Sequence, residues 1–281
     1  NIDSEHLDFY KSIKNLKNKF IDFVEKTPSL GKSFLCIDEK NIKEILKKIK
    51  NKNFYTYGVN KNANFQIINI EQNKIFSKFD LKIKIPGNLS IIKNIKIPLI
   101  GLHNIKNAAS AVSVSFLIGI RVSTIKNGLL NFKGVQRRFN FLFKKGQTLF
   151  YDDYAHHPTE IKSVLDGVKK VYTKKKIICV FQPHRISRLK ILKKEFSESF
   201  LKADTVLLCP IYKANENINL GFSYNSFAKL IIKNSKVNLI YVKNERQLRN
   251  LLRKTAYGDK IYIGMGAGSI SNWMKKLKNE I

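Results

Sequence analysis

The stretch TLFYDDYAHHPTEIKSVLDGVKKVYTKKKIICVFQPHRISR, residues 148–188, decides the fold. It contains a short β-rich run at 148–151, a helix with Pro158 in its first turn, and an apolar run at 177–181. A strand, a helix and a second strand at this spacing predict a βαβ unit with parallel strands. Each strand leads into a polar segment, and such sheets bind ligands at the carboxyl ends of their strands.

The alternation continues to the end of the chain. A helix is expected at 187–201, and strands are expected at 205–209, 238–242 and 260–263, each followed by a helix. This pattern predicts that residues 135–281 form a doubly wound, mostly parallel, Rossmann-like α/β domain.

Residues 1–134 have a different pattern and are expected to form a separate domain. A helix is predicted at 8–24, a strand at 33–37 and a helix at 39–49. Short β-rich runs broken by Asn and Gly then predict strands and hairpins over 54–100. A helix rich in small residues follows at 101–120.

The charge is strongly positive, with 52 Lys and Arg against 21 Asp and Glu among 281 residues. Only eight of these cations are Arg, while Lys occurs 44 times and Asn 28 times, which is the bias of an AT-rich genome. The lysines are spread along the chain and are not interleaved with aromatic residues, so a nucleic-acid partner is not expected. A basic nucleic-acid-binding module remains the alternative. A hydrophobic content of 43% excludes a disordered chain.

The three cysteines and the apolar runs indicate the compartment. Cys36, Cys179 and Cys209 are far apart and form no CxxC pair, so neither a disulfide framework nor a zinc site is expected. No apolar run reaches 18 residues, and the amino terminus does not resemble a signal peptide. We therefore expect a protein of the reducing cytoplasm without a membrane partner. The first residue is not Met, which suggests a fragment or a processed product.

Polar segments that contain histidine mark the candidate site. In 152–160, Asp152 and Asp153 can hold a ribose hydroxyl or a metal, while His156 and His157 at a helix start suit an anion. The alternative is an N-capping loop with a structural histidine pair. In 182–188, His184 precedes two arginines. Arg185 and Arg188 can clamp a carboxylate or phosphate, or they can be solvated helix residues.

Three further segments give weaker signals. Arg137 and Arg138 lie at the domain boundary, where an arginine can reach a nucleotide phosphate or belong to a solvated linker. His103, Asn104 and Asn107 lie at a helix start, where Asn can pair with an adenine edge or cap the helix. The Gly-rich turn at 264–269 is not a complete dinucleotide fingerprint and is interpreted as tight packing near the site.

Seven segments together resemble the Mur ligases of peptidoglycan synthesis, and they occur in family order across the chain. They are NIDSEHLD (1–8), GLHNIKNAASA (101–111), QRRF (136–139), DDYAHHPTEI (152–161), FQPHRISR (181–188), IYKANE (211–216) and GAGS (266–269). A recycling member of the family, which joins a peptide to UDP-N-acetylmuramate, shares DD-aromatic-x-HHPT. It lacks FQPHR-x-SR and NID-x-x-HLD and is the lesser candidate.

The resemblance implies an ATP-dependent ligase that uses Mg²⁺ and joins L-alanine to UDP-N-acetylmuramate through an acyl phosphate. It implies that His6 binds a magnesium ion and that Asn104 and Asn107, beside His103, contact adenine. Arg138, or its neighbour Arg137, would reach the phosphates, and Asp152 or Asp153 would contact the ribose. The alanine and muramyl carboxylate contacts would come from His157, Arg185 and Arg188, supported by His156 and His184.

Some parts of the family pattern are missing. There is no G-x-x-x-x-G-K-[ST] phosphate loop, no amino-terminal uridine-nucleotide domain and no carboxylate expected to help hold magnesium. The chain is therefore expected to open inside the central ATPase domain, with the rest of that domain in a missing amino-terminal half. We expect no ATP turnover from this portion alone. A decayed remnant without activity is a third possibility.

Overall fold

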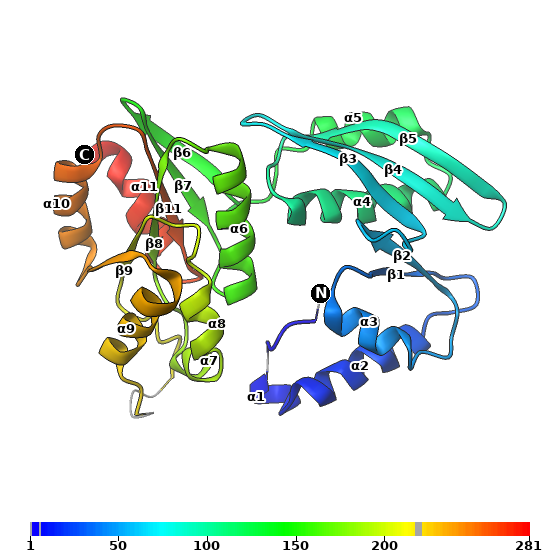
Figure 1. The fold of residues 1–281 in the computed structure, drawn as a ribbon, viewed down its shortest axis with the longest axis horizontal. Coiled ribbons are helices and arrows are strands. Elements are labelled where there is room, and N and C mark those ends of the chain that lie inside the picture. The colour runs from blue at the N-terminus through cyan, green and yellow to red at the C-terminus, as the bar shows by residue number, and fades with distance from the viewer. Residues whose placement is uncertain (1, 6, 217–220) are drawn as a thin grey trace. The chain divides into compact units, whose positions relative to one another are not determined.

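The computed structural model describes residues 2–5, 7–216 and 221–281 and divides them into two compact units (Figure 1). The first unit ends at Lys133 and the second begins at Gly134. In the described part of the chain, no helix is long and apolar enough to span a bilayer.

The first unit has a five-stranded mixed sheet in the order β1-β2-β3-β4-β5. The β1–β2 and β2–β3 pairs are parallel, whereas β3–β4 and β4–β5 are antiparallel. The strands are β1 (Ser33–Cys36), β2 (Phe54–Gly58), β3 (Phe65–Gln72), β4 (Ser77–Ile85) and β5 (Asn88–Ile97). The helices are α1 (Leu7–Tyr10), α2 (Ile13–Glu25), α3 (Lys40–Leu46), α4 (Leu102–Leu117) and α5 (Val122–Leu130).

Alternating side chains make the core of this unit. Phe79, Leu81 and Ile83 of β4 are fully buried and belong to one cluster with Ala109 and Val112 of α4. The small residues of α4 let the helix backbone approach the sheet, and each buried Phe or Leu contributes about 2–3 kcal/mol. A second cluster joins α2 and α3 to β1.

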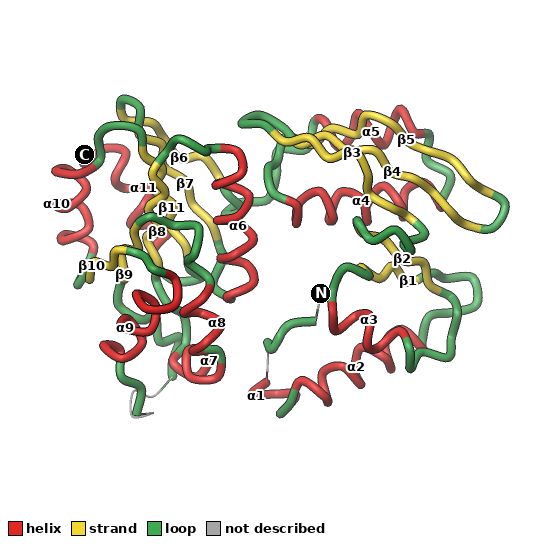
Figure 2. Tube along the Cα trace, viewed as in Figure 1, coloured by secondary structure: helices red, strands yellow, loops and turns green. Residues whose placement is uncertain are grey.

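The second unit has a six-stranded sheet in the order β10-β9-β8-β11-β7-β6, with helices on both faces (Figure 2). All neighbours are parallel except β6, which is antiparallel to β7. The strands are β6 (Asn140–Lys145), β7 (Thr148–Asp153), β8 (Lys176–Phe181), β9 (Thr205–Leu208), β10 (Asn238–Tyr241) and β11 (Lys260–Met265). The helices are α6 (Pro158–Val171), α7 (Ile186–Ile191), α8 (Lys193–Glu198), α9 (Tyr224–Ser235), α10 (Glu245–Thr255) and α11 (Ile270–Glu280).

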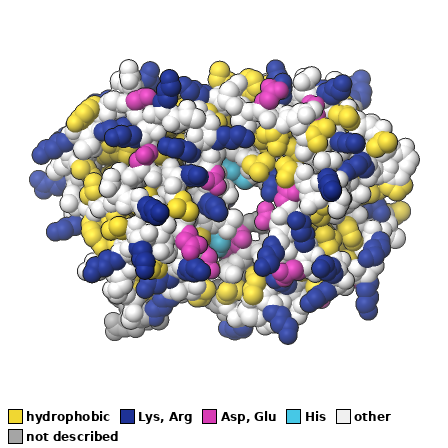
Figure 3. Space-filling view, in the orientation of Figure 1, with side chains coloured by type: hydrophobic (Ala, Val, Ile, Leu, Met, Phe, Trp, Pro, Cys, Tyr) yellow, Lys and Arg dark blue, Asp and Glu magenta, His cyan; other side chains and the backbone are white. Residues whose placement is uncertain are grey.

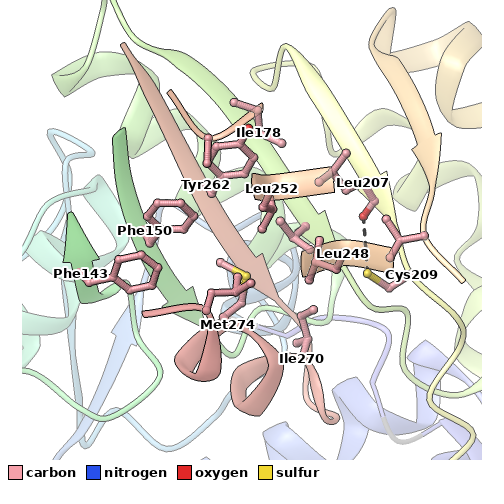
Figure 4. Close-up of a cluster of buried hydrophobic side chains, with 14 residues drawn as sticks. Phe143, Phe150, Ile178, Leu207, Cys209, Leu248, Leu252, Tyr262, Ile270 and Met274 are labelled. Atoms are coloured by element: carbon pink, nitrogen blue, oxygen red, sulfur yellow. Dashed lines mark hydrogen bonds between the residues drawn. The ribbon is translucent and has the colours of Figure 1, made fainter. Parts of the chain in front are cut away.

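One face of this sheet packs against α10 and α11. Phe150, Tyr262 and Met274 form the centre of a buried cluster that Leu248 and Leu252 complete from α10 (Figure 4). The rings of Phe150 and Tyr262 are stacked with their centroids 5.2 Å apart. This packing holds β7 and β11 rigidly side by side, and both strands end at the candidate site.

The doubly wound, mostly parallel sheet confirms the predicted fold class. Three local expectations differ. The helix expected at 8–24 is interrupted at Lys11, whose φ is +64°, and restarts behind the N-cap Ser12. The helix expected at 187–201 is divided at Leu192. The edge strand β6 was not expected, because its short apolar run directly follows the basic linker. It pairs with β7, to which the turn at Gly146 joins it.

Candidate functional site

The carboxyl ends of three adjacent strands bring the polar segments of the second unit together. Met265 at the end of β11 pairs with Asp153 of β7 on one side and with Phe181 of β8 on the other. The segments that follow, 154–160, 182–188 and 266–269, therefore begin at one level of the sheet. A bridge between His184 and Tyr212 adds the segment that leaves β9.

The two carboxylates at the end of β7 are enclosed, with 1% exposure for Asp152 and 2% for Asp153. Asp153 accepts the N–H groups of Phe139 and Ala155, both at 2.7 Å. Burial raises the pKa of Asp153 to about 6, although these two hydrogen bonds oppose the rise. Asp152 accepts the Ser271 hydroxyl at 2.6 Å through Oδ2, and its Oδ1 has no hydrogen-bond partner. The structure thus gives both residues a structural task, and the ribose contact stays a prediction.

The start of α6 is organised by a carboxylate that the sequence reasoning did not single out. Glu160 accepts the N–H of His156 at 3.1 Å and of His157 at 3.3 Å, while His157 Nδ1 accepts from Thr159 N–H at 3.3 Å. This is a capping box with His157 as the N-cap, and His157 is only 5% exposed. A Glu three residues after the cap is the signal that could have identified it. His157 is therefore built into the helix start, and a substrate contact by its ring stays a prediction.

The neighbouring arginines at the domain boundary differ in their surroundings. Arg137 donates to the carbonyl of Gly266 at 2.5 Å and pairs with buried Asp152 at 3.7 Å. Its guanidinium carbon lies 4.6 Å from the centroid of the Tyr154 ring. Arg138 is 49% exposed and pairs with Glu160 at 3.0 Å. Arg137 is thus anchored inside the unit, whereas Arg138 lies at its surface.

His184, Arg185 and Arg188 surround the start of α7. Arg188 Nη1 lies 3.3 Å from His184 Nδ1, and the His156 and His184 ring centroids are 5.8 Å apart. Burial, together with the charges of Arg188, His156 and Arg185, lowers the pKa of His184 to about 4. His184 is therefore neutral near pH 7. With Nδ1 accepting from Arg188, its proton resides on Nε2 and can be donated to a ligand oxygen.

The Gly-rich turn after β11 packs closely on these segments. A Cβ at Gly266, where φ is +148°, would lie 2.6 Å from the carbonyl oxygen of Gln182. Gln182 in turn accepts the N–H of Ile270 at 3.0 Å and donates to Ser269 at 3.0 Å. The turn is tightly packed beside the site, as its sequence suggested.

The first unit contains the predicted adenine contacts at the start of α4. Asn104 donates its amide to the carbonyl of Ile100 at 2.7 Å, so its amide oxygen can accept from an exocyclic amine such as that of adenine. Asn107 is exposed and His103 is half-buried. The adenine contact of these residues stays a prediction.

A second charged cluster in the same unit was not expected. Lys106 pairs with Asp38 at 3.2 Å and with Glu39 at 3.4 Å. Asp38 also accepts the N–H groups of Val59 and Asn60, both at 3.0 Å, which ties the ends of β1 and β2 together. Lys106 thus offsets one of the two negative charges in this cluster.

Among the described residues, no group of three or more His, Cys, Asp or Glu could hold a metal ion such as magnesium. His6, the predicted magnesium ligand, lies outside the described residues.

Comparison with protein families gives the same division of the chain. Residues 1–115 match the Mur ligase middle domain, and residues 137–268 match the Mur ligase glutamate ligase domain. The chain belongs to the Mur ligase family.

Curated relatives agree with this membership. A UDP-N-acetylmuramate–L-alanine ligase of Pelagibacter ubique is 58% identical over 99% of this Mur ligase chain and 60% of the relative. One of Rickettsia bellii is 39% identical over 99% of this chain and 59% of the relative. The chain thus spans about 60% of the length of the curated relatives it matches.

Solved structures share the fold. The UDP-N-acetylmuramate-alanine ligase MurC of Thermotoga maritima superposes with a TM-score of 0.74 at 21% identity, over 98% of this chain and 57% of the other. The MurF ligase of Thermotoga maritima, solved in complex with ADP, gives a TM-score of 0.73 at 16% identity, over 100% of this chain and 62% of the other.

Proposed function

We propose that the chain is the rear of the ATP-binding domain and the carboxyl-terminal domain of a ligase that joins L-alanine to UDP-N-acetylmuramate. The observation that carries the proposal is the 58% identity over 99% of the chain to a relative of that name. Because the chain spans 60% of that relative, we assign the activity to the whole ligase and expect none from this portion alone. The three buried free cysteines support work in the reducing cytoplasm.

The reaction proposed from the family has two steps. The lactyl carboxylate of UDP-N-acetylmuramate takes up the γ-phosphoryl group of ATP, and ADP leaves. The amine of L-alanine then attacks the acyl carbon, an amide bond forms, and phosphate and a proton are released. A magnesium ion would supply charge neutralisation at the phosphates.

We propose tasks for the groups around α7, supported by their contacts and charges. Arg185 and Arg188 supply the positive charge that holds the muramyl carboxylate or the carboxylate of alanine. His184, neutral and protonated on Nε2, orients a substrate oxygen without adding a further charge. His156 and His157 complete the wall of the site from the start of α6.

Arg138 is the better candidate for the phosphate contact. Its guanidinium is half-exposed, and the ion pair with Glu160 can be exchanged for a phosphate at little cost. Arg137 is held by Gly266, Asp152 and the Tyr154 ring and cannot leave without exposing these partners.

Phosphate release by the whole ligase tests the proposed function. The chain, linked to its phosphate-loop half, should release phosphate only when UDP-N-acetylmuramate and L-alanine are both present. Release without alanine, or turnover only with a tripeptide, would overturn the assignment, and the second outcome would indicate the recycling ligase. Arg188→Lys should lower kcat/KM about tenfold or more, because Lys keeps the charge but lacks the bidentate fork.

The charge on the face drawn in Figure 3 does not favour a second function. Figure 3 shows Lys and Arg scattered over the visible face instead of gathered over one element. This distribution fits codon drift better than a nucleic-acid groove.

A further inference from the structure

The segment IYKANE, residues 211–216, resembles the family pattern, but none of its residues has a role in the proposed reaction. It leaves the carboxyl end of β9 and runs beside the segment that precedes α7. The N–H of Tyr212 donates to the carbonyl of Pro183 at 2.8 Å, and the carbonyl of Tyr212 accepts the N–H of Arg185 at 3.0 Å. The two backbones are therefore joined on both sides of His184.

The Tyr212 ring joins a third segment to this pair. It stacks on the His184 ring with a centroid separation of 5.5 Å and an interplanar angle of 10°. A Cβ at Gly268 would lie 2.5 Å from Cγ of Tyr212, so the ring also lies directly against the Gly-rich turn. The absence of a side chain at position 268 is what makes room for it.

Glu216 forms the second attachment, on the other side of Arg185. Its carboxylate accepts the Ser187 N–H at 3.1 Å and also accepts the Ser187 hydroxyl. Burial opposes ionisation, but the Ser187 and Ile186 hydrogen bonds and the charge of Arg185 hold the pKa of Glu216 below its usual value. An ionised carboxylate is thus fixed at the start of α7, close to Arg185.

These attachments hold an unfavourable backbone in place. Arg185 has a φ of +66°, and Ala214 and Asn215 in the opposite segment have φ values of +50° and +66°. Such left-handed residues persist only where their surroundings impose them. Tyr212 fixes the backbone at Pro183 and Arg185, and Glu216 fixes it at Ser187. Together they impose the conformation of Arg185.

We propose that Glu216 is a positioning residue of the ligase, which fixes Arg185 and the start of α7 for the substrate carboxylate. The inference rests on the proposed function. Arg185 touches the substrate in this scheme, and Glu216 acts through Ser187 and the Arg185 backbone.

Kinetics of the whole ligase test the proposal. Glu216→Ala should raise the KM for UDP-N-acetylmuramate or L-alanine about tenfold, because an arginine displaced by an ångström loses its fork geometry. The KM for ATP should stay within about twofold, since, among the residues that the structure describes, Glu216 has no contact with those proposed to bind the nucleotide. Glu216→Gln keeps an acceptor oxygen but loses the negative charge, so its KM should lie between those of the parent and Glu216→Ala. Lys213→Ala, an exposed residue of the same segment, is the matched control and should resemble the parent.

Hydrogen exchange separates this inference from the proposed function. The amides of 184–188 should exchange at least about tenfold faster in Glu216→Ala or Glu216→Gln than in the parent or in Lys213→Ala. Unchanged exchange in both Glu216 variants would overturn the positioning role, whatever the activity. The positioning role is also overturned if the parent is active and its Glu216 variants keep the parental KM for both UDP-N-acetylmuramate and L-alanine. A parent that releases phosphate without alanine would overturn the proposed function alone, and exchange would still decide the role of Glu216.

Discussion

Replacing Arg137 should cost the carboxyl-terminal unit far more stability than replacing Arg138, although the two residues are adjacent. Arg137→Met keeps the apolar stem but leaves Asp152, which is 1% exposed, without its cation. Removing one partner of a buried pair costs about 3–5 kcal/mol. The 3.7 Å separation and the bond from Ser271 reduce this to about 2 kcal/mol for Asp152. The lost bond to Gly266 adds about 1 kcal/mol.

Arg138→Met removes only a half-exposed ion pair, which contributes about 0.5 kcal/mol after solvent screening. For a unit of this size 1 kcal/mol corresponds to about 2–4 °C. We therefore expect the melting temperature to fall by about 6–12 °C for Arg137→Met and by about 1–2 °C for Arg138→Met.

Thermal and urea unfolding of the chain, followed by circular dichroism, would measure this difference. Adding Asp152→Asn to Arg137→Met should recover about half of the loss, since it removes the uncompensated charge. Equal destabilisation by the two single variants, or no recovery in the double variant, would refute the distinction between an anchored and an exchangeable arginine. In the whole ligase, Arg138→Met should instead lower kcat and leave the melting temperature nearly unchanged.

Four further predictions concern single residues. Gly268→Ala places a carbon 2.5 Å from the Tyr212 ring and should lower the free energy of unfolding by about 1–3 kcal/mol in urea titrations. Gly128→Ala lies in a helix and faces open space, so the same titration should show a gain of about 0.5–1 kcal/mol. Glu160→Gln should cost about 1 kcal/mol at pH 7. The pKa of Glu160 is lowered, so this contribution is present above the ordinary pKa of 4.5 and lost as the pH falls through the lowered value; a deficit that does not shrink on acidification would contradict the assignment. The pKa of Asp153 is shifted in the opposite direction, to about 6. Its contribution to stability is therefore complete below the ordinary pKa of 3.8 and is lost as the pH rises through 6. An NMR titration should therefore show one carboxyl group ionising near pH 6, and its persistence in Asp153→Asn would contradict the assignment.

The sequence predicts the sheet of the second unit well because its strands are apolar runs between clear helix starts. Lys176–Phe181 and Lys260–Met265 lie within two residues of the runs expected from the pattern. The edge strand β6 lacks such a run, since Phe141 is exposed and Phe143 is buried within a cluster where it stacks on Phe150. Its formation depends on tertiary contacts that no local pattern contains.

The site could be predicted as a group of segments but not as a set of contacts. Polar residues after parallel strands must meet at one edge, and 152–160 and 182–188 do so. The difference between Arg137 and Arg138 depends on partners such as Gly266 that lie more than a hundred residues away. Tyr212 also depends on partners from other segments of the chain, because its ring lies against Gly268 and His184.

The stacking of Tyr212 between His184 and the Gly268 backbone has a consequence for how this family can diverge. A side chain at position 268 has room only if residue 212 is smaller or its ring rotates. In either case His184 loses the ring on which it stacks. Each single change is therefore harmful while a joint change can be tolerated. We expect the three positions to covary among homologues, so that an engineered specificity change at 184 would need compensating substitutions at 212 and 268.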